Sequence, residues 1–154
     1  MALNGPESTM RREVIRMRND MADLPMLMQG FERFCKDTGV PRESILSVLL
    51  CLEELVVNTI WYGYEEEVAG EIETTTEVGD GKLTVTIKDD ARQFDPFDHQ
   101  MPDVRLGVDE RRIGGLGIHL TFKFMDHVDY TREGGNNVVR ISKNLPPAAG
   151  PGSA

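Results

Sequence analysis

Glu54 and Asn58 are polar residues within the largely apolar segment Ile45–Ile60. Because a helix advances about 100° per residue, positions four apart lie within roughly 40° of each other, so the two side chains share a face if this segment is helical. A carboxylate and a carboxamide on an otherwise apolar face cost free energy unless they meet a polar partner, so they indicate contact with a polar group. The alternative interpretation is a polar helix edge exposed to water.

A second candidate site lies where the alternating segment Lys82–Lys88 runs directly into the paired acids Asp89 and Asp90. A carboxylate at the end of a strand, facing a pocket, can accept a hydrogen bond from an exocyclic amino group such as that of a purine base. The alternative is an Asx turn that only closes the strand.

A third candidate site is a glycine cluster, Gly114, Gly115 and Gly117, with Arg111 and Arg112 just before it. Glycines let backbone amides approach an anion, and both the start of the helix predicted to follow and the arginines attract negative charge. This chemistry suits a polyphosphate. The alternative is that the glycines form a flexible joint before the helix.

Several common active-site motifs are missing from the sequence. The chain has no Gly-x-x-x-x-Gly-Lys-Ser/Thr phosphate loop, and Gly115-Leu-Gly117 lacks the third glycine of a dinucleotide-binding fingerprint. Its three histidines and two cysteines are not spaced as zinc ligands. Ser44 and Ser47 have neither a nucleophile elbow nor a nearby base, so serine-nucleophile chemistry has no support.

The hydrophobic pattern predicts the elements that must position these residues. Apolar residues at helical spacing predict three helices, and alternating residues predict five strands. The helices are Met21–Lys36, Arg42–Trp61 and Leu116–His127, and the strands are Glu13–Arg18, Glu71–Val78, Lys82–Lys88, Val128–Arg132 and Val138–Lys143. The first strand is expected at a sheet edge because both of its faces carry arginine.

The order of these elements predicts a two-layer α/β (α+β) sandwich. Hairpins across Gly79-Asp-Gly81 and Glu133-Gly-Gly-Asn-Asn137 replace most βαβ crossovers, so the sheet should be mixed and mainly antiparallel, with its helices on one face. The stretch from Asp90 to Gly114 has no periodicity and is far longer than an ordinary connection of about 4 to 6 residues, which is typical of a functional loop.

Length and composition indicate a single domain of 154 residues. We expect a flexible leader at residues 1–12, the domain at residues 13–143, and a disordered Pro/Gly/Ala-rich tail at residues 144–154. No secretion signal is recognisable, and Cys35 and Cys51 lie in apolar, helix-like segments as buried thiols would, so the expected location is the cytoplasm. The net charge of −9, from 17 basic and 26 acidic residues, argues against direct nucleic-acid binding, and no apolar run suggests a membrane span.

Taken together, three motifs resemble the N, G1 and G2 boxes of the Bergerat-fold (GHKL, histidine-kinase-like) ATP-binding domains. They are Glu53-Glu-Leu-Val-Val-Asn58, Asp89-Asp-Ala-Arg-Gln-Phe-Asp-Pro96 and Gly114-Gly-Leu-Gly-Ile-His-Leu120. The similarity is closer still to one branch, the bacterial anti-sigma factors that are serine-protein kinases, and it extends from about Val14 to Lys143.

The resemblance implies a set of roles for residues of this chain. Glu54 would be the catalytic base, Asn58 would ligate Mg²⁺, and Asp89 would recognise adenine. ATP would also be bound by Ala91, Phe94, Arg105, Arg111, Arg112, Gly114, Gly115, Leu116 and Gly117. Residues 97–113 would form a mobile lid. The chain departs from the family pattern at Ala91, where the G1 box usually has a glycine. We expect the added methyl group to be tolerated, and the alternative is weaker nucleotide binding.

The same resemblance implies a regulatory function. The protein would sequester a sigma factor and phosphorylate a STAS-domain anti-anti-sigma antagonist on serine, with partner exchange as the switch. A homodimer is expected, and the Met-rich segment (Met17, Met21, Met26, Met28) would either form an adaptable apolar surface or belong to the core. The alternative function is a non-catalytic ATP-binding interaction module.

Overall fold

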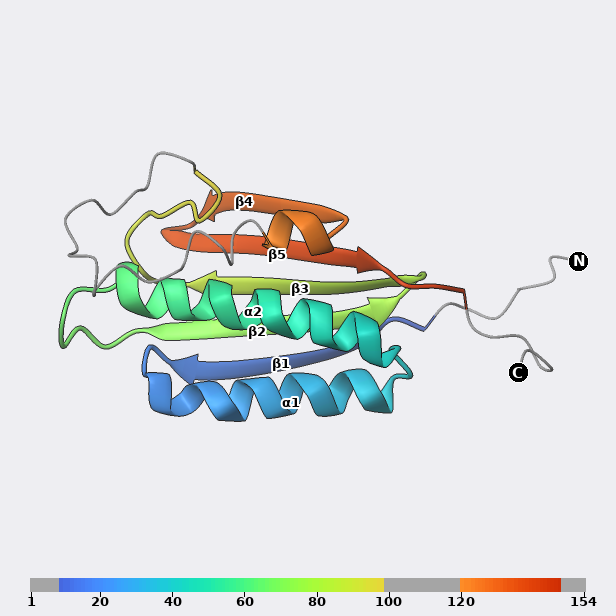
Figure 1. The fold of residues 1–154 in the computed structure, drawn as a ribbon. Coiled ribbons are helices and arrows are strands. Elements are labelled where there is room, and N and C mark those ends of the chain that lie inside the picture. Colours follow the sequence, from blue (N-terminus) through green and yellow to red (C-terminus); the bar gives the residue numbers. More distant parts are fainter. Residues whose placement is uncertain (1–8, 99–119, 148–154) are drawn as a thin grey trace, which may run out of the picture.

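The computed structural model describes residues 9–98 and 120–147. Its elements are, in order, β1 (Arg11–Arg18), a 3-10 turn (Met21–Asp23), α1 (Leu24–Asp37), α2 (Arg42–Tyr62), β2 (Glu71–Gly79), β3 (Lys82–Asp89), β4 (His127–Glu133) and β5 (Asn136–Asn144). A short helical stretch at residues 120–124 precedes β4. Each strand and helix predicted within these ranges is present, with boundaries that differ by a few residues (Figure 1).

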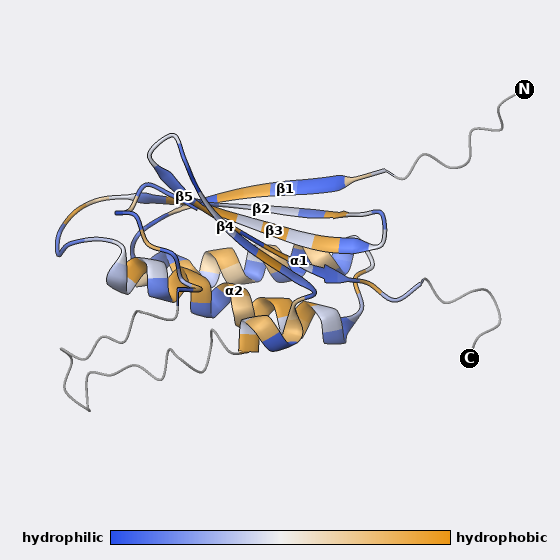
Figure 2. Ribbon diagram, turned by 90° about the horizontal axis from the view of Figure 1, so that it is seen from above, coloured by the Kyte–Doolittle hydropathy of each residue, from blue (hydrophilic) through white to orange (hydrophobic). Residues whose placement is uncertain are grey.

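The five strands form one sheet in the order β1-β2-β3-β5-β4. All four neighbouring pairs are antiparallel, so the parallel component expected of a mixed sheet is absent from the strands that the structure describes. β1 lies at one edge, as predicted. Both α1 and α2 lie on the same face of the sheet in two perpendicular views, which confirms the two-layer arrangement (Figures 1 and 2).

The two long helices supply most of the core. α1 buries a single stripe of residues (Leu24, Leu27, Phe31, Phe34 and Cys35) and is followed by Gly39, whose φ of 79° a glycine adopts without strain. α2 is apolar on most sides and is coloured mainly as hydrophobic in Figure 2. This helix has 21 residues, and its most apolar 18-residue stretch has a mean hydropathy of 1.6, which is the length and composition of a membrane-spanning helix. Half of that stretch is buried inside the protein. Much of its apolar surface therefore belongs to the core.

The two cysteines are free and buried, as the sequence predicts. Burial raises the pKa of the Cys35 thiol to about 12, and burial also raises the pKa of Cys51. Both thiols therefore stay protonated and behave as small apolar side chains. The methionines divide between the two predicted roles: Met17 is buried and Met28 packs against the core, whereas Met21 and Met26 are exposed.

The β4–β5 hairpin differs from the prediction in a way that affects the site. Its turn consists of Gly134 and Gly135 alone, both with positive φ (55° and 81°), which is the geometry of a two-residue type I′ hairpin turn. Asn136 and Asn137, expected in the turn, instead begin β5. Asn137 is therefore a strand residue, and it is 3% exposed.

Two other boundaries also differ from the sequence-based expectation. The third helix was expected to reach His127, but the helical stretch ends at residue 124 and His127 already belongs to β4. The Lys143 ammonium donates a hydrogen bond to the Phe124 carbonyl (2.8 Å), which satisfies an acceptor at that helix end. At the other end of the domain, β5 includes Asn144, and the Leu145 amide donates to the Gly81 carbonyl (2.7 Å), so ordered pairing continues past residue 143.

Candidate functional site

The two candidate site residues of α2, Glu54 and Asn58, lie in its C-terminal half. Asn58 is 5% exposed, and its side-chain Oδ1 is buried without a hydrogen bond to any described residue. Glu54, one turn earlier, is half-buried, and its Oε1 is also buried. The exposed-edge interpretation is therefore wrong for Asn58. A buried carboxamide oxygen that accepts no hydrogen bond costs about 1 to 3 kcal/mol, so this position favours a polar ligand.

The Asn58 oxygen has the chemistry of a magnesium ligand. Mg²⁺ prefers oxygen donors and is commonly held by one or two side chains together with waters and the phosphates of a nucleotide. Within residues 9–98 and 120–147, no group of three or more His, Cys, Asp or Glu side chains could hold a metal on its own. The buried Asn58 oxygen fits a cation that is brought in with a phosphate ligand, and Asn58 would be its protein ligand.

Asp89 is the last residue of β3 and is 4% exposed. Its Oδ1 accepts hydrogen bonds from the Ala91 amide (3.0 Å) and from the side-chain amide of Asn137 (2.9 Å). The first of these is the Asx-type bond that the alternative interpretation predicts, but neither bond uses Oδ2. Burial raises the pKa of the Asp89 carboxyl, and the two hydrogen bonds act in the opposite direction. A buried carboxylate with one oxygen fixed by the protein is suited to recognise a hydrogen-bond donor through the other.

Residues 89–94, here called the G1 segment, are fastened to the C-terminal end of α2. The Arg92 guanidinium donates from Nε to the Tyr62 carbonyl (2.9 Å), and the Arg92 amide donates to the Gly63 carbonyl (3.1 Å). Both carbonyls lie at a helix end, where acceptors lack partners within the helix. The Phe94 ring stacks on the Tyr62 ring with centroids 6.5 Å apart and an interplanar angle of 20°. These contacts bring the Asn58 end of α2 and the Asp89 end of β3 to the same side of the molecule.

Ala91, which replaces the usual glycine of the G1 box, packs against α2. It is 3% exposed, and a Cβ built on Gly63 would lie 2.8 Å from the Ala91 methyl carbon. The methyl group therefore fills a space that exists because residue 63 is a glycine. This packing explains how the fold accommodates alanine at a position where a glycine is expected.

Tyr64 and Asp90 tie the connection after α2 to the G1 segment. Asp90 Oδ1 accepts hydrogen bonds from the Tyr64 hydroxyl (2.7 Å) and from the Glu71 amide (3.0 Å). Burial alone would raise the pKa of the Asp90 carboxyl, but these bonds outweigh it and lower the pKa. The pKa of Tyr64 is raised by burial and by Asp90. Asp90 therefore acts as a fixed anchor beside Asp89, since its carboxylate is already engaged with the protein.

The residue that sequence reasoning missed is Asn137, whose side chain links the G1 segment to β4. Its Oδ1 accepts hydrogen bonds from the Phe94 amide (3.1 Å), the Tyr130 hydroxyl (2.6 Å) and the Arg132 guanidinium (3.0 Å). Gly134-Gly135 alone is enough for a two-residue hairpin turn, but the asparagines that follow also favour turns and so hide the start of the strand. Arg132 also donates to the Ala91 carbonyl (3.0 Å).

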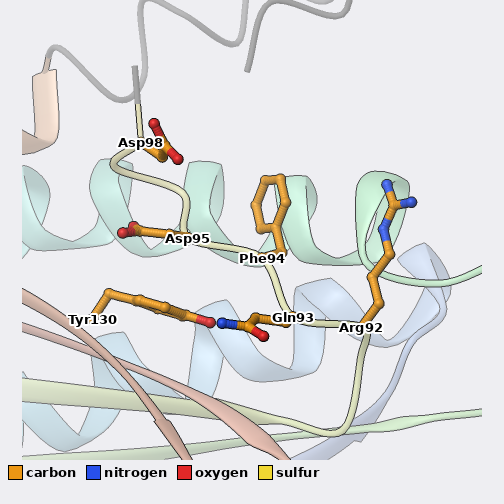
Figure 3. A pocket seen from close by; sticks show the side chains of 6 residues that line it. All are labelled: Arg92, Gln93, Phe94, Asp95, Asp98 and Tyr130. Carbon is orange, nitrogen blue, oxygen red and sulfur yellow. The ribbon is translucent and has the colours of Figure 1, made fainter. Parts of the chain in front are cut away.

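A cavity of about 400 Å³ opens between the G1 segment and β4. Its lining consists of Arg92, Gln93, Phe94, Asp95, Asp98 and Tyr130. Figure 3 shows the Tyr130 side chain extending from β4 with its hydroxyl toward the chain at Gln93. A space of this size is within the range of small-molecule sites, and it adjoins the Asn137 network through Tyr130 and Phe94.

The structure brings five of the predicted site residues to one end of the sheet and α2, namely Glu54, Asn58, Asp89, Ala91 and Phe94. The remaining seven lie outside the described residues: Arg105, Arg111, Arg112, Gly114, Gly115, Leu116 and Gly117. The predicted lid, residues 97–113, is described only as far as residue 98.

The fold is that of a histidine kinase-like ATPase domain. The model of that family matches residues 17–143, and the chain belongs to the family. It is similar to the serine-protein kinase RsbW of Listeria monocytogenes serovar 1/2a, at 29% identity over 105 residues that cover 66% of this chain and 67% of the relative. It is also similar to the anti-sigma F factor of Clostridium botulinum (strain Eklund 17B), at 28% identity over 105 residues, or 67% of this chain and 73% of the relative.

A solved structure shows the same fold. The crystal structure of the RsbU and RsbW domains of Rv1364c from Mycobacterium tuberculosis superposes with a TM-score of 0.65. The match covers 90% of this chain and 34% of that chain, at 14% sequence identity. The expected Bergerat-type sandwich is therefore confirmed.

Proposed function

We propose that this protein is an anti-sigma regulatory factor and an ATP-dependent serine-protein kinase. The proposal rests on two buried groups at one end of the fold, the Asn58 oxygen and the Asp89 carboxylate. One suits a cation that accompanies phosphates, and the other suits the amino group of a base. A ligand that needs both is a magnesium-bound adenine nucleotide. The names of the similar proteins, serine-protein kinase and anti-sigma factor, support the proposed activity.

In this proposal the base and the phosphates of ATP are bound at opposite ends of the site. Asp89 accepts a hydrogen bond from the adenine amino group, with Ala91 and Phe94 beside it. The phosphates are bound by the Gly114–Gly117 segment (Gly114, Gly115, Leu116, Gly117) and by one or more of Arg105, Arg111 and Arg112. When bound, Mg²⁺ neutralises phosphate charge, and Asn58 is its protein ligand.

Glu54 is the proposed general base. A serine hydroxyl of the protein substrate attacks the γ-phosphorus, the bond to the β,γ-bridging oxygen breaks, and the hydroxyl proton passes to the Glu54 carboxylate. The products are ADP and a phosphoserine. Since Glu54 lies one turn before Asn58 on the same rigid helix, the base and the ligand of the phosphate-bound cation are held in a fixed relation.

The proposed partners are a sigma factor and a STAS-domain anti-anti-sigma protein, which is the serine substrate. Sequestration of the sigma factor and phosphorylation of the antagonist by a cytoplasmic homodimer would constitute a partner switch. Direct contact with nucleic acid or with a membrane forms no part of the proposal.

The test is phosphate transfer from labelled ATP, with Mg²⁺, to a purified STAS-domain protein from the same organism. Glu54→Gln should lower transfer by about 100-fold or more while leaving ATP binding within a few-fold, because a base acts only in the chemical step. Glu53→Gln is the matched control, because Glu53 is exposed and its substitution removes the same charge one residue away. If wild-type protein binds ATP but transfers no phosphate, the kinase proposal fails and the non-catalytic ATP-binding module is the better assignment.

A further inference from the structure

Asn137 occupies the centre of a buried hydrogen-bond network in the part of the chain that the structure describes. Its Oδ1 accepts the three bonds described above, and its Nδ2 donates to Asp89 Oδ1 (2.9 Å) and to the Arg92 carbonyl (2.8 Å). The side chain thus joins β3, the G1 segment, β4 and its own strand, although it is a single amide at a strand position. An amide with all its bonding capacity used in this way is held in one orientation.

The backbone register explains why Asn137 meets Asp89. On β3, Asp89 is the direct cross-strand partner of Asn137 on β5, and Asn137 is the direct partner of Arg132 on β4. Direct cross-strand partners point to the same face of a sheet. Asp89, Asn137 and Arg132 therefore point to the face of the sheet that α2 covers, at the end of β3 where the G1 segment begins.

The groups around Asn137 also determine which type of side chain can stand there. Three donors, from Phe94, Tyr130 and Arg132, surround the oxygen, and two acceptors, Asp89 Oδ1 and the Arg92 carbonyl, surround the nitrogen. A carboxylate at this position would place a second negative oxygen against Asp89 Oδ1. A hydroxyl has too few hydrogen-bonding groups to meet both sets.

We propose that Asn137 is a positioning residue for base recognition: it fixes Asp89 Oδ1, which directs the remaining oxygen, Oδ2, at the nucleotide as an acceptor and so favours adenine over guanine. An adenine offers an amino donor at the position where guanine has a carbonyl oxygen, and a carboxylate held as an acceptor repels that carbonyl. This inference rests on the proposed ATP site and adds to it the residue that holds its base-reading carboxylate.

Charged groups among the described residues shift the pKa of the Asp89 carboxyl in both directions. The negative charge of Asp90, the next residue, disfavours the ionised form of Asp89, whereas the positive charge of Arg132 on β4 favours it. Asp89 in turn raises the pKa of Tyr64, which lies in the connection after α2. Burial is the largest influence and raises the pKa of Asp89. ATP binding by the wild-type protein should therefore weaken as pH falls through that raised pKa, because the protonated carboxyl is a poorer acceptor.

The experiment replaces the amide with a carboxyl of the same shape. In Asn137→Asp, two carboxyl groups face each other at the 2.9 Å separation now spanned by the amide and Asp89. At low pH they share one proton, which takes the place of the amide hydrogen; at high pH both ionise and repel. We expect the ratio of variant to wild-type MgATP affinity, measured by calorimetry between pH 5 and 9, to fall by about tenfold or more as pH rises. Protonation of the nucleotide itself cancels in this ratio.

Asn136→Asp is the matched control, because Asn136 precedes Asn137 on β5 and its side chain points to the opposite face. Its affinity ratio to wild type should be flat with pH. A flat ratio for Asn137→Asp as well would overturn the inference while leaving the proposed function intact. Absence of MgATP binding by the wild-type protein would instead overturn the proposed function.

A second variant keeps the inference testable if Asn137→Asp fails to fold. Asn137→Val is neutral and of similar size but carries no hydrogen-bond donor, so Asp89 Oδ1 keeps only its bond from the Ala91 amide. The ratio of MgATP to MgGTP affinity should then fall by about tenfold relative to wild type. A ratio equal to that of the wild type, in a variant whose circular dichroism spectrum is native, would show that Asn137 has no part in base selection.

Discussion

Asn58 and Asn137 are two asparagines of nearly equal burial, 5% and 3% exposed, at the same end of the molecule. Their hydrogen bonding is opposite. The Asn58 oxygen accepts no bond from a described residue, whereas the Asn137 side chain makes five. The difference separates the two tasks of the proposed site. A cation that arrives with the ligand needs an oxygen acceptor left open for it, but selection of a base needs groups fixed before the ligand arrives.

The same difference has a consequence for stability. An open buried acceptor costs free energy in the protein without ligand, whereas a satisfied network adds to the stability of the fold. Function at Asn58 and stability should therefore be in conflict, and at Asn137 they should be coupled. Substituting each residue and measuring both activity and stability distinguishes conflict at Asn58 from coupling at Asn137.

The largest effect is expected from Asn58→Ala on activity. Loss of the cation ligand should reduce phosphate transfer by about 100-fold, and MgATP affinity should fall with it. The free energy of unfolding without ligand should stay the same or rise by up to about 1 kcal/mol, because an unsatisfied buried amide is removed and alanine has the higher helix propensity. Urea denaturation and transfer assays measure the two quantities. A marked loss of stability would show that the Asn58 side chain is satisfied within the protein.

Asn137→Ala should behave in the opposite manner. Its removal leaves the donors of Phe94, Tyr130 and Arg132 without their acceptor and Asp89 Oδ1 with one donor fewer. We expect the free energy of unfolding to fall by about 3 kcal/mol, with ATP binding lost in parallel. Denaturation in urea without nucleotide tests this directly, and a change below about 1 kcal/mol would contradict it.

The contrast between these two residues also shows what the sequence reveals and what it conceals. Asn58 stands out because a polar residue on an apolar helix is a local anomaly, and both hairpins are local patterns of alternation around Asp80-Gly81 and Gly134-Gly135. Asn137 does not stand out, because Gly-Gly-Asn-Asn contains four residues that all favour turns. Its function depends on Asp89, 48 positions earlier in the chain, and that pairing is set by the strand order β3-β5.

A similar limit applies to the helix that precedes β4. The pattern of apolar residues extends the predicted helix to His127, since no glycine or proline follows Gly117 within it. The helical stretch ends earlier because Lys143 binds the Phe124 carbonyl and Asp126 pairs with Ser142 on β5. Both contacts join residues that are distant in sequence, so periodicity does not reveal them.

A smaller effect is expected where the G1 segment packs against α2. In Gly63→Ala the new methyl carbon would lie 2.8 Å from Ala91 Cβ and 2.6 Å from the Thr59 carbonyl oxygen, so the free energy of unfolding should fall by about 2 kcal/mol. Adding Ala91→Gly relieves only the first contact and should restore about half of that loss. The measurement is a double-mutant cycle, and additive losses would contradict the proposed packing.

The smallest effect concerns the Asp89 carboxylate, which lies within the satisfied network and yet remains costly. Because burial raises its pKa in the folded protein above its value in the unfolded chain, the stabilisation associated with its protonated form is present below the unfolded pKa of about 3.9 and is lost as pH rises through the raised pKa. Asp89→Asn keeps the shape, retains an acceptor for Ala91 and Asn137, and does not titrate. In urea denaturation without nucleotide, the variant should therefore gain stability relative to wild type as pH rises from 3.5 to 8, although it loses ATP binding. If the two proteins show the same pH dependence, the Asp89 carboxylate is fully compensated by its hydrogen bonds, and the base-reading end of the site carries no stability cost comparable to that of Asn58.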